Sequence, residues 1–265
     1  MSGKGGCFIG ASLSCVDILV YLYFDYLNIY KSNLASENRD LFLLSKGHDV
    51  PALYSVLSEK EILEKERLND HCSVNDDIYW HPNVNIPGIE FHSGSLGHGL
   101  SVAIGFAYFQ KIRKLKSKTV VMIGDGEMNE GSIWEGLLVA SAKKLDNLII
   151  VVDRNEFQAN LKTEDLIPLE PIDDKIKSFG CNPVRINGHK FSEIKNGFKT
   201  LENEGQKPSV IIADTVRGKG LPSIERDPTR WFVHFSEKEV EMLLGELHGE
   251  KIANLTSEKL LVRWT

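Results

Sequence analysis

An acidic, glycine-rich stretch, "GDGEMNEG", directly follows the apolar run "TVVMI". It contains Asp125, and Asn155 stands 30 residues further on, just beyond a second apolar run, "NLIIVVD". One carboxylate, one amide oxygen and a backbone carbonyl suit Mg²⁺, which usually takes one or two protein side chains and fills its shell with ligand phosphates. Gly124 and Gly126 leave room for a phosphate to approach the backbone. The spacing predicts a magnesium and diphosphate site formed by the two segments.

Two other phosphate-binding loops are not indicated. A nicotinamide-binding loop would carry G-x-G-x-x-G after the strand, and a Walker loop would carry G-K-S/T; neither motif is present here. Taken alone, GDG after a strand is often only a tight acidic turn. The spacing to Asn155 is what favours the metal site over that simple turn.

The elements that must position these residues follow from the apolar patterns. Runs of continuous apolarity alternate with helical patterns, which predicts an α/β fold with a doubly wound parallel sheet and helices on both faces. Ligands bind beyond the carboxyl ends of the strands in such a fold. Two S-x-x-E capping boxes, at Ser132 and Ser236, predict helix starts, and Ser12 or Ser14 could cap the first helix. The predicted strands are 40–44, 119–124, 147–153, 183–186 and 209–216, and the predicted helices are 11–27, 49–69, one from 100, 132–145, 172–179, 191–203 and 236–247.

Composition is consistent with one globular domain covering 1–265, with an irregular segment and a last helix from about 218. The chain is 42% hydrophobic and 26% charged, and its formal net charge of −6 gives no general attraction to nucleic acid or to an anionic membrane. The basic run at 111–118 is interpreted as cations that complement a helix end. Four scattered cysteines without a CxxC pair, and no apolar stretch near about 18 residues, predict a soluble cytoplasmic protein.

Several blocks of the chain resemble one family of enzymes. The GDG followed by an asparagine resembles the diphosphate-binding signature of thiamine-diphosphate enzymes. The surrounding sequence resembles transketolase, and specifically split transketolases whose N-terminal half is a separate subunit. The resemblance runs in the family's order from about Gly6 to beyond Arg217. Its blocks are "LSKGHDVPALY", "GIEFHSGSLGHGLSVAIG", "GDGEMNEGSIWEGLLVASAKKLDNLIIVVDRNEFQ", "PLEPIDDKIKSFG" and "PSVIIADTVRGKG".

The resemblance implies how thiamine diphosphate would be held. Asp125, the side chain of Asn155 and the backbone carbonyl of Phe157 would ligand Mg²⁺, or Ca²⁺ or Mn²⁺ in its place. Gly126 would approach the diphosphate, and His48 would reach it. Each of these assignments rests on a residue of this sequence that matches one position of the family's motifs.

Other matched positions imply contacts with the aminopyrimidine ring and the substrate. The backbone at Gly94 and Leu96 would contact the ring, and small residues there fit a close approach. His81 would lie near the reacting carbon, hydrogen-bond substrate hydroxyls and move protons near neutral pH. His98 stands where transketolases commonly carry glutamine, so a structural hydrogen bond and a catalytic role both remain open.

The resemblance also implies an interface residue and shows two departures. Glu130 resembles a glutamate that couples paired active sites at a subunit interface; the alternative is a solvated carboxylate at a helix start. Phe8 stands in place of a histidine that handles protons on the substrate. Phe232 follows Trp231 where a histidine is usual, with His234 two positions on. Both departures indicate a changed substrate, a specialised branch or reduced activity.

The resemblance implies transfer of a two-carbon ketol unit from a ketose, or ketose phosphate, to an aldehyde. In this family a second domain supplies the glutamate that activates the cofactor, and no second sheet-forming half follows residue 217. The expected partner is a C-terminal transketolase subunit in an α₂β₂ assembly. The alternatives are a deoxyxylulose-phosphate synthase-like enzyme or another thiamine-diphosphate enzyme, a non-catalytic cofactor-binding or regulatory subunit, and, more distantly, a nicotinamide oxidoreductase.

Overall fold

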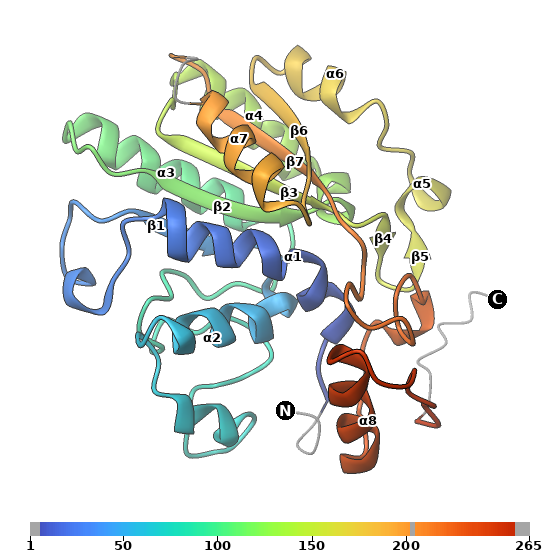
Figure 1. Cartoon of the computed structure of the whole chain (residues 1–265). Coiled ribbons are helices and arrows are strands. Elements are labelled where there is room, and N and C mark those ends of the chain that lie inside the picture. The colour runs from blue at the N-terminus through green and yellow to red at the C-terminus, as the bar shows by residue number, and fades with distance from the viewer. Residues whose placement is uncertain (1–5, 202–204, 258–265) are drawn as a thin grey trace.

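The protein is built around a parallel β-sheet. The computed structural model describes residues 6–201 and 205–257. Five strands pair in the order β1-β2-β3-β7-β6, and every pair is parallel (Figure 1). The predicted α/β fold is therefore confirmed. The strands are β1 (Leu41–Leu44), β2 (Thr119–Gly124), β3 (Leu148–Arg154), β6 (Asn182–Asn187) and β7 (Ser209–Asp214).

Helices cover both faces of this sheet (Figure 1). Side chains from one face of the strands pack with α1, α2 and α7 in one apolar cluster. Side chains from the other face pack with α3, α4 and α6 in a second cluster. Because β2, β3 and β7 are buried on both sides, they lack the alternation of polar and apolar residues that a half-exposed strand shows, whereas β6, at the edge, leaves Arg185 exposed. The helices are α1 (Ile9–Tyr21), α2 (Val50–Glu59), α3 (Gly99–Ile112), α4 (Gly131–Ala142), α6 (Ile172–Ser178) and α7 (Phe191–Leu201).

The C-terminal segment packs against the start of α1. A third apolar cluster joins α8 (Glu237–Leu247) to side chains near the beginning of the described chain. An isolated antiparallel bridge between Cys7 and Val233 brings the two ends together. The predicted capping box is confirmed here, because Ser236 and Glu239 accept hydrogen bonds from each other's backbone N–H. This contact closes the region beside the carboxyl ends of the strands.

The first helix covers nearly the range predicted for it, 11–27, and its apolar stretch reaches membrane-spanning length. A short π-helical turn continues α1, so that 18 helical residues from Ile9 to Tyr26 have a mean hydropathy of 1.3. The expectation that no apolar stretch reaches membrane-spanning length is therefore wrong. Within this window, 56% is buried inside the protein, and a core helix of a soluble protein meets the same criterion. The helix packs on α2 and the sheet, which explains why it is apolar on most faces.

Two predicted helix caps do not form. The helix α4 begins at Gly131 after Glu130, with no side-chain cap, because the Ser132 hydroxyl instead donates to the backbone oxygen of Gly97 at 2.8 Å. The helix α1 begins at Ile9, so Ser12 and Ser14 lie inside it rather than at its start. The hydroxyls of Ser132 and Ser14 donate to distant groups, Gly97 and Asp153, whereas the Ser12 hydroxyl is buried without a hydrogen-bond partner.

Several short elements were not predicted. A two-stranded hairpin, β4 (Phe157–Gln158) and β5 (Leu161–Lys162), follows β3 and leads into the single turn α5 (Thr163–Leu166). The helix predicted over 49–69 is in fact α2, followed after a break by a 3₁₀ segment at Lys65–Asp70. Strands of two residues carry too little periodicity to be found from sequence.

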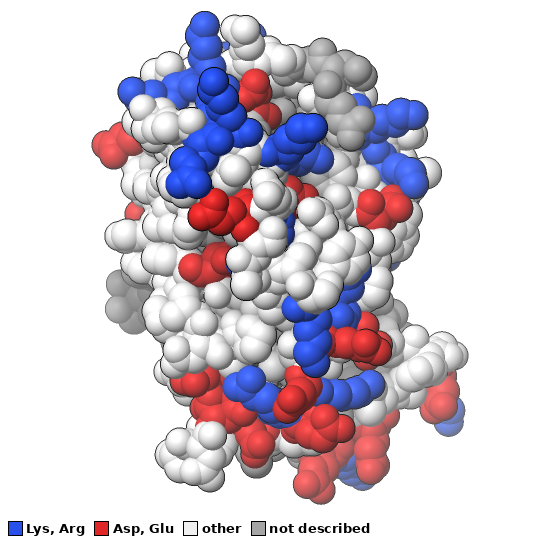
Figure 2. Space-filling view, turned by 90° about the vertical axis from the view of Figure 1, so that its left-hand side faces the viewer, with Lys and Arg blue, Asp and Glu red and all other residues white. Residues whose placement is uncertain are grey.

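Charged side chains are unevenly spread over the face seen in Figure 2. Lys and Arg gather towards the top of this face, and Asp and Glu towards the bottom.

Within the basic run 111–118, Lys111 lies in the last turn of α3 and pairs with Asp146 at 2.6 Å, while Arg113 pairs with Glu37 at 3.3 Å. The interpretation of the run as helix-end cations fits these positions.

Candidate functional site

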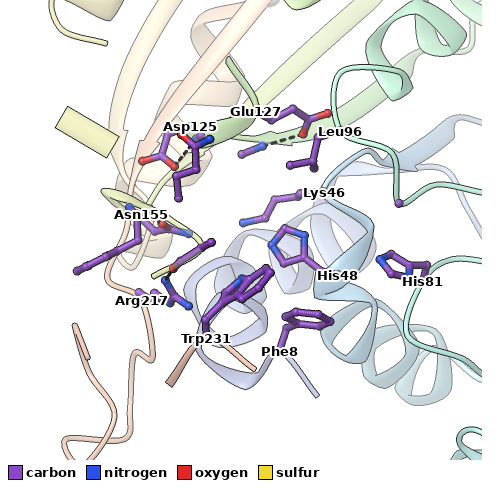
Figure 3. A pocket seen from close by; sticks show the side chains of 17 residues that line it. Phe8, Lys46, His48, His81, Leu96, Asp125, Glu127, Asn155, Arg217 and Trp231 are labelled. Carbon is purple, nitrogen blue, oxygen red and sulfur yellow. Dashed lines mark hydrogen bonds between the residues drawn. The ribbon is translucent and has the colours of Figure 1, made fainter. Parts of the chain in front are cut away.

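A cavity of about 450 Å³ opens at the carboxyl ends of β1, β2 and β3. Figure 3 shows Asp125 and Asn155 towards one end of it and His48 and Phe8 towards the other, with Arg217 and Trp231 side by side between them. Most of the predicted site residues line it, including the candidate metal ligands; His98 and Glu130 do not. The predicted residues in its lining are His48, His81, Gly94, Leu96, Asp125, Gly126, Asn155 and Phe157.

The predicted metal ligands come together because β2 and β3 are neighbours and parallel. The Asp125 carboxylate is buried and accepts hydrogen bonds from the backbone N–H of Gly126 and of Glu156, each at 2.7 Å. The Asn155 amide donates to Asp153 at 3.1 Å, and its oxygen accepts from the N–H of Phe157 at 3.0 Å. A buried carboxylate and an amide oxygen on adjoining turns form a donor set that fits a hard divalent cation.

A buried arginine lies directly beside this donor set. Arg154 donates to the Asp125 carboxylate at 2.7 Å and also pairs with Glu164 at 2.7 Å and Glu170 at 3.4 Å. Burial raises the pKa of Asp125, and the Arg154 charge opposes that rise. A divalent ion bound at Asp125 would therefore share this carboxylate with Arg154, which keeps two further carboxylates on its other side.

Arg217 is a lining residue that the sequence reasoning missed. Its side chain is only 2% exposed, and its Nε and Nη2 atoms have no hydrogen-bond partner, while Nη1 donates to the Ala159 carbonyl. Its guanidinium also lies 5.4 Å from the centroid of the Phe157 ring. Burial lowers the pKa of Arg217 to about 10, which still leaves it charged at neutral pH. Two unpartnered donors on a buried cation that lines a cavity fit an anionic ligand such as a diphosphate.

A second cation near the cavity is already neutralised. The Lys46 ammonium lies 2.6 Å from the Asp49 carboxylate and also contacts Asp153, and all three groups are buried. Burial alone would lower the pKa of Lys46, but the two carboxylates outweigh it and hold that pKa well above its usual value. Asp153 also accepts from Ser14 at 2.5 Å and from Thr215. This network holds Lys46 in place in the cavity lining. It also orients Asn155, whose amide donates to Asp153.

The same carboxylates lie close to Cys15, in a group whose geometry could hold a metal ion. Lys46 supplies the positive charge at this position, because it contacts both Asp49 and Asp153. Burial raises the pKa of the Cys15 thiol well above its usual value, so the thiolate that a metal requires is disfavoured. The group therefore acts as a buried ion network and not as a second metal centre.

Glu127 is a further residue that the sequence reasoning left without a role. Its carboxylate is buried and accepts from the N–H of Gly97 at 2.9 Å, from the N–H of Gly124 at 3.2 Å and from the Ser45 hydroxyl. These donors are Gly124 at the end of β2, Ser45 just after β1, and Gly97 just before α3. Burial raises the pKa of Glu127, and the three hydrogen bonds oppose that rise. Through these hydrogen bonds Glu127 connects the segments that carry Ser45, Gly97 and Gly124.

Two histidines line the end of the cavity away from Asp125. Burial lowers the pKa of His48 to about 3, with added repulsion from Lys46, and burial also lowers the pKa of His81. Both rings are therefore neutral near pH 7. Gly94 has φ +138° beside His81, and a Cβ there would lie 2.7 Å from the His81 ring. The absence of a side chain at Gly94 is what lets the His81 ring approach this backbone.

The remaining predicted residues lie outside the cavity lining. His98 is exposed just before α3, and its Nδ1 lies 3.2 Å from the Leu96 backbone oxygen. Glu130 is exposed at the N-cap of α4, where it neighbours Gly97. A catalytic role for His98 and an interface role for Glu130 stay predictions.

Comparison with known proteins identifies the family. The family described as "Transketolase, thiamine diphosphate binding domain" matches residues 2–247. An apulose-4-phosphate transketolase subunit from Actinobacillus succinogenes is 37% identical over 94% of this chain and 90% of the relative. Its counterpart in Phocaeicola vulgatus is 38% identical over 82% and 77%. The 6-deoxy-6-sulfo-D-fructose transketolase subunit SqwG of a Clostridium species is 33% identical over 91% and 88%.

A solved structure supports the same conclusion. The transketolase of Campylobacter jejuni superposes with a TM-score of 0.85 and 28% identity over 94% of this chain. The chain spans about 40% of the length of that enzyme. The chain belongs to the transketolase family and corresponds to its thiamine diphosphate binding domain.

Proposed function

We propose that this chain is the diphosphate-binding subunit of a split transketolase. Its relatives of similar length are named as subunits, and the solved transketolase is a much longer chain. The active enzyme would then need a partner chain that carries the pyrimidine-binding domain, in an α₂β₂ assembly. Four free cysteines accord with a reducing cytoplasm.

The observation that carries this proposal is the pairing of an oxygen donor set with an unpartnered buried cation. Asp125, Asn155 and the carbonyl of Phe157 would hold Mg²⁺, or Ca²⁺ or Mn²⁺, and Arg217 would donate to the diphosphate from the cavity wall. Glycine at 126 lets a phosphate approach the backbone. The family's cofactor, thiamine diphosphate, supplies the nucleophilic carbon and the carbanion chemistry.

In the proposed reaction, the bond between the second and third carbons of a ketose or ketose phosphate breaks. The two-carbon ketol unit then forms a new carbon–carbon bond to the carbonyl carbon of an aldehyde, and the shortened aldehyde leaves. This chain would orient the substrate through His81, while His48 would reach the diphosphate. Both are neutral near pH 7, so each can accept one proton or hydrogen bond and donate another.

The test is reconstitution with the separately expressed partner. Isothermal titration with thiamine diphosphate and Mg²⁺ should show tight binding by the complex, and a coupled assay with a panel of ketoses should show transfer to an added aldehyde. Absence of cofactor binding by the complex would contradict the proposal.

A second candidate, a cofactor-binding regulatory subunit, is favoured by one observation. Phe8 and Phe232 stand where the family's proton-handling histidines are expected, and a phenyl ring moves no proton. Cofactor binding by the complex without transfer from any ketose in the panel would support this candidate instead.

A further inference from the structure

Four aromatic side chains form a cluster at the end of the cavity away from Asp125. The Phe8 ring centroid lies 5.0 Å from that of Trp231 and 4.9 Å from that of Phe232, and Trp80 contacts Phe232 at 5.9 Å. Phe8 also meets the His48 ring edge-on at 5.4 Å. Phe8 and Trp231 line the cavity itself, and Figure 3 shows both beside His48. We call Phe8, Trp80, Trp231 and Phe232 the aromatic cluster.

The backbone is arranged to hold this cluster. Cys7 and Val233 exchange two hydrogen bonds, at 2.9 and 3.0 Å, which set the segment carrying Phe8 against the one carrying Phe232. Gly6 has φ +80°, and a Cβ there would lie 2.8 Å from the Phe232 ring. The two phenylalanines that replace expected histidines are therefore in direct contact, although 224 positions separate them in the chain.

The polar groups at this end of the cavity are the imidazoles of His48 and His81, each neutral and able to accept one hydrogen bond and donate another. The faces of the Phe8 and Trp231 rings beside them offer no hydrogen-bonding partner. Lys46 is engaged by two carboxylates, and the free donors of Arg217, which lies beside Trp231 in Figure 3, are assigned above to the diphosphate of the cofactor. A hydroxyl placed against the rings of the aromatic cluster would lose water without gaining a partner, which is unfavourable, whereas a C–H surface placed there would gain from burial.

We propose that Phe8, with Phe232 packed behind it, makes this site select a substrate whose segment against Phe8 and Trp231 lacks hydroxyls. The chemical class is a deoxy or otherwise hydroxyl-poor aldehyde or ketose. Phe8 is the residue that determines specificity by contact, and Phe232 acts by positioning it. The inference rests on the proposed function, because it concerns the substrate of the same cavity.

The experiment uses the reconstituted complex with hydroxypyruvate as donor, which yields the same two-carbon unit with release of CO₂. The acceptors are glyceraldehyde, lactaldehyde, 3-hydroxypropanal and propanal, which differ only in their hydroxyls at the second and third carbons. The measured quantity is the ratio of kcat/KM for a deoxy acceptor to that for glyceraldehyde. This ratio should exceed one for at least one deoxy acceptor.

Phe8→His should lower that ratio about tenfold, the discrimination that a hydrophobic pocket provides for a group of this size. Phe8→Leu keeps an apolar wall and should keep the preference. The same exchange at an exposed ring, Phe24→His, should leave the ratio unchanged. Phe232→His is the second variant should Phe8→His fail to fold. If both fold, the double variant should deviate from additivity, because the rings touch.

The outcomes separate the inference from the proposed function. Transfer with a wild-type ratio below one for every deoxy acceptor, or a ratio unchanged in both Phe8→His and Phe232→His, would overturn the inference and leave the proposed function standing. Cofactor binding without transfer to any of the four aldehydes would overturn both.

Discussion

Replacing Arg217 with methionine should separate the stability of the chain from its affinity for the cofactor. In the free chain the guanidinium is buried, and two of its nitrogen atoms have no partner. The substitution removes one hydrogen bond, to Ala159, worth about 1 kcal/mol, and relieves unsatisfied donors that each cost about 1–3 kcal/mol. The free energy of unfolding should therefore rise by about 1–5 kcal/mol.

The effect on cofactor binding should have the opposite sign. A hydrogen bond from a charged donor to a phosphate contributes about 1.5–3 kcal/mol, which corresponds to about 10- to 150-fold in affinity. Arg217→Met should weaken binding of thiamine diphosphate with Mg²⁺ by that factor. Isothermal titration of the reconstituted complex measures the affinity, and urea unfolding of the free chain measures the stability.

The matched control for Arg217 is Arg185→Met. Arg185 is half-exposed, pairs with Glu170, Asp173 and Asp214, and lies outside the cavity lining, so its removal should leave the affinity unchanged. The reasoning about Arg217 would be refuted if Arg217→Met lowered the free energy of unfolding by more than about 2 kcal/mol while the affinity stayed at the wild-type value.

Three further predictions concern the metal, pH and the last helix. Asp125→Asn should weaken Mn²⁺ binding in the presence of thiamine diphosphate at least about tenfold by electron paramagnetic resonance, because a carboxylate ligand becomes a neutral amide; wild-type affinity would argue against the ligand assignment. Burial depresses the pKa of His48 to about 3, so the unfolded chain takes up a proton below about pH 6.5 that the folded chain does not. Stability should thus fall as pH drops from 6.5 towards 3, and His48→Gln should remove about 1–2 kcal/mol of the loss between pH 7 and pH 5 in urea unfolding; identical pH profiles would contradict this. Glu239→Ala should cost about 2 kcal/mol and speed hydrogen exchange in α8, since Glu239 accepts from the N–H groups of Ser236, Thr256 and Ser257; unchanged exchange in α8 would show that the cap contributes nothing.

The sheet could be predicted because four of its strands, all but the edge strand β6, are apolar runs buried on both faces. The range 119–124 matches β2, and each predicted strand overlaps one that forms, since long apolar runs bounded by turns are the strongest single-sequence signal. Helix starts were harder. The Ser132 hydroxyl could have capped its own helix, but in the fold it donates to the backbone oxygen of Gly97. A local sequence pattern cannot predict a hydrogen bond to a residue that only the fold brings near.

The candidate metal site could be placed from sequence for a related reason. Asp125 and Asn155 each follow a strand, and neighbouring parallel strands bring such residues to one edge. The same rule would have found Arg217, which follows β7 closely, if the ends of all strands had been examined. Glu127 could not be found this way, because two of its three donors, Ser45 and Gly97, are distant in the sequence and only the fold brings them to it.

The departures at Phe8 and Phe232 show what a structure adds to a resemblance. In the sequence they are two separate substitutions near opposite ends of the chain. In the structure their rings are in contact, so they form one unit, of which Phe8 lines the cavity. That contact turns a doubt about activity into a specific expectation about the substrate.

The central claim is that this chain binds the diphosphate of the cofactor but needs a partner chain for ketol transfer. The most direct measurement compares transfer by this chain alone, by the partner alone and by the two mixed, each with thiamine diphosphate, Mg²⁺, a ketose panel and an aldehyde acceptor. The account predicts transfer in the mixture only. Transfer by this chain alone would contradict it.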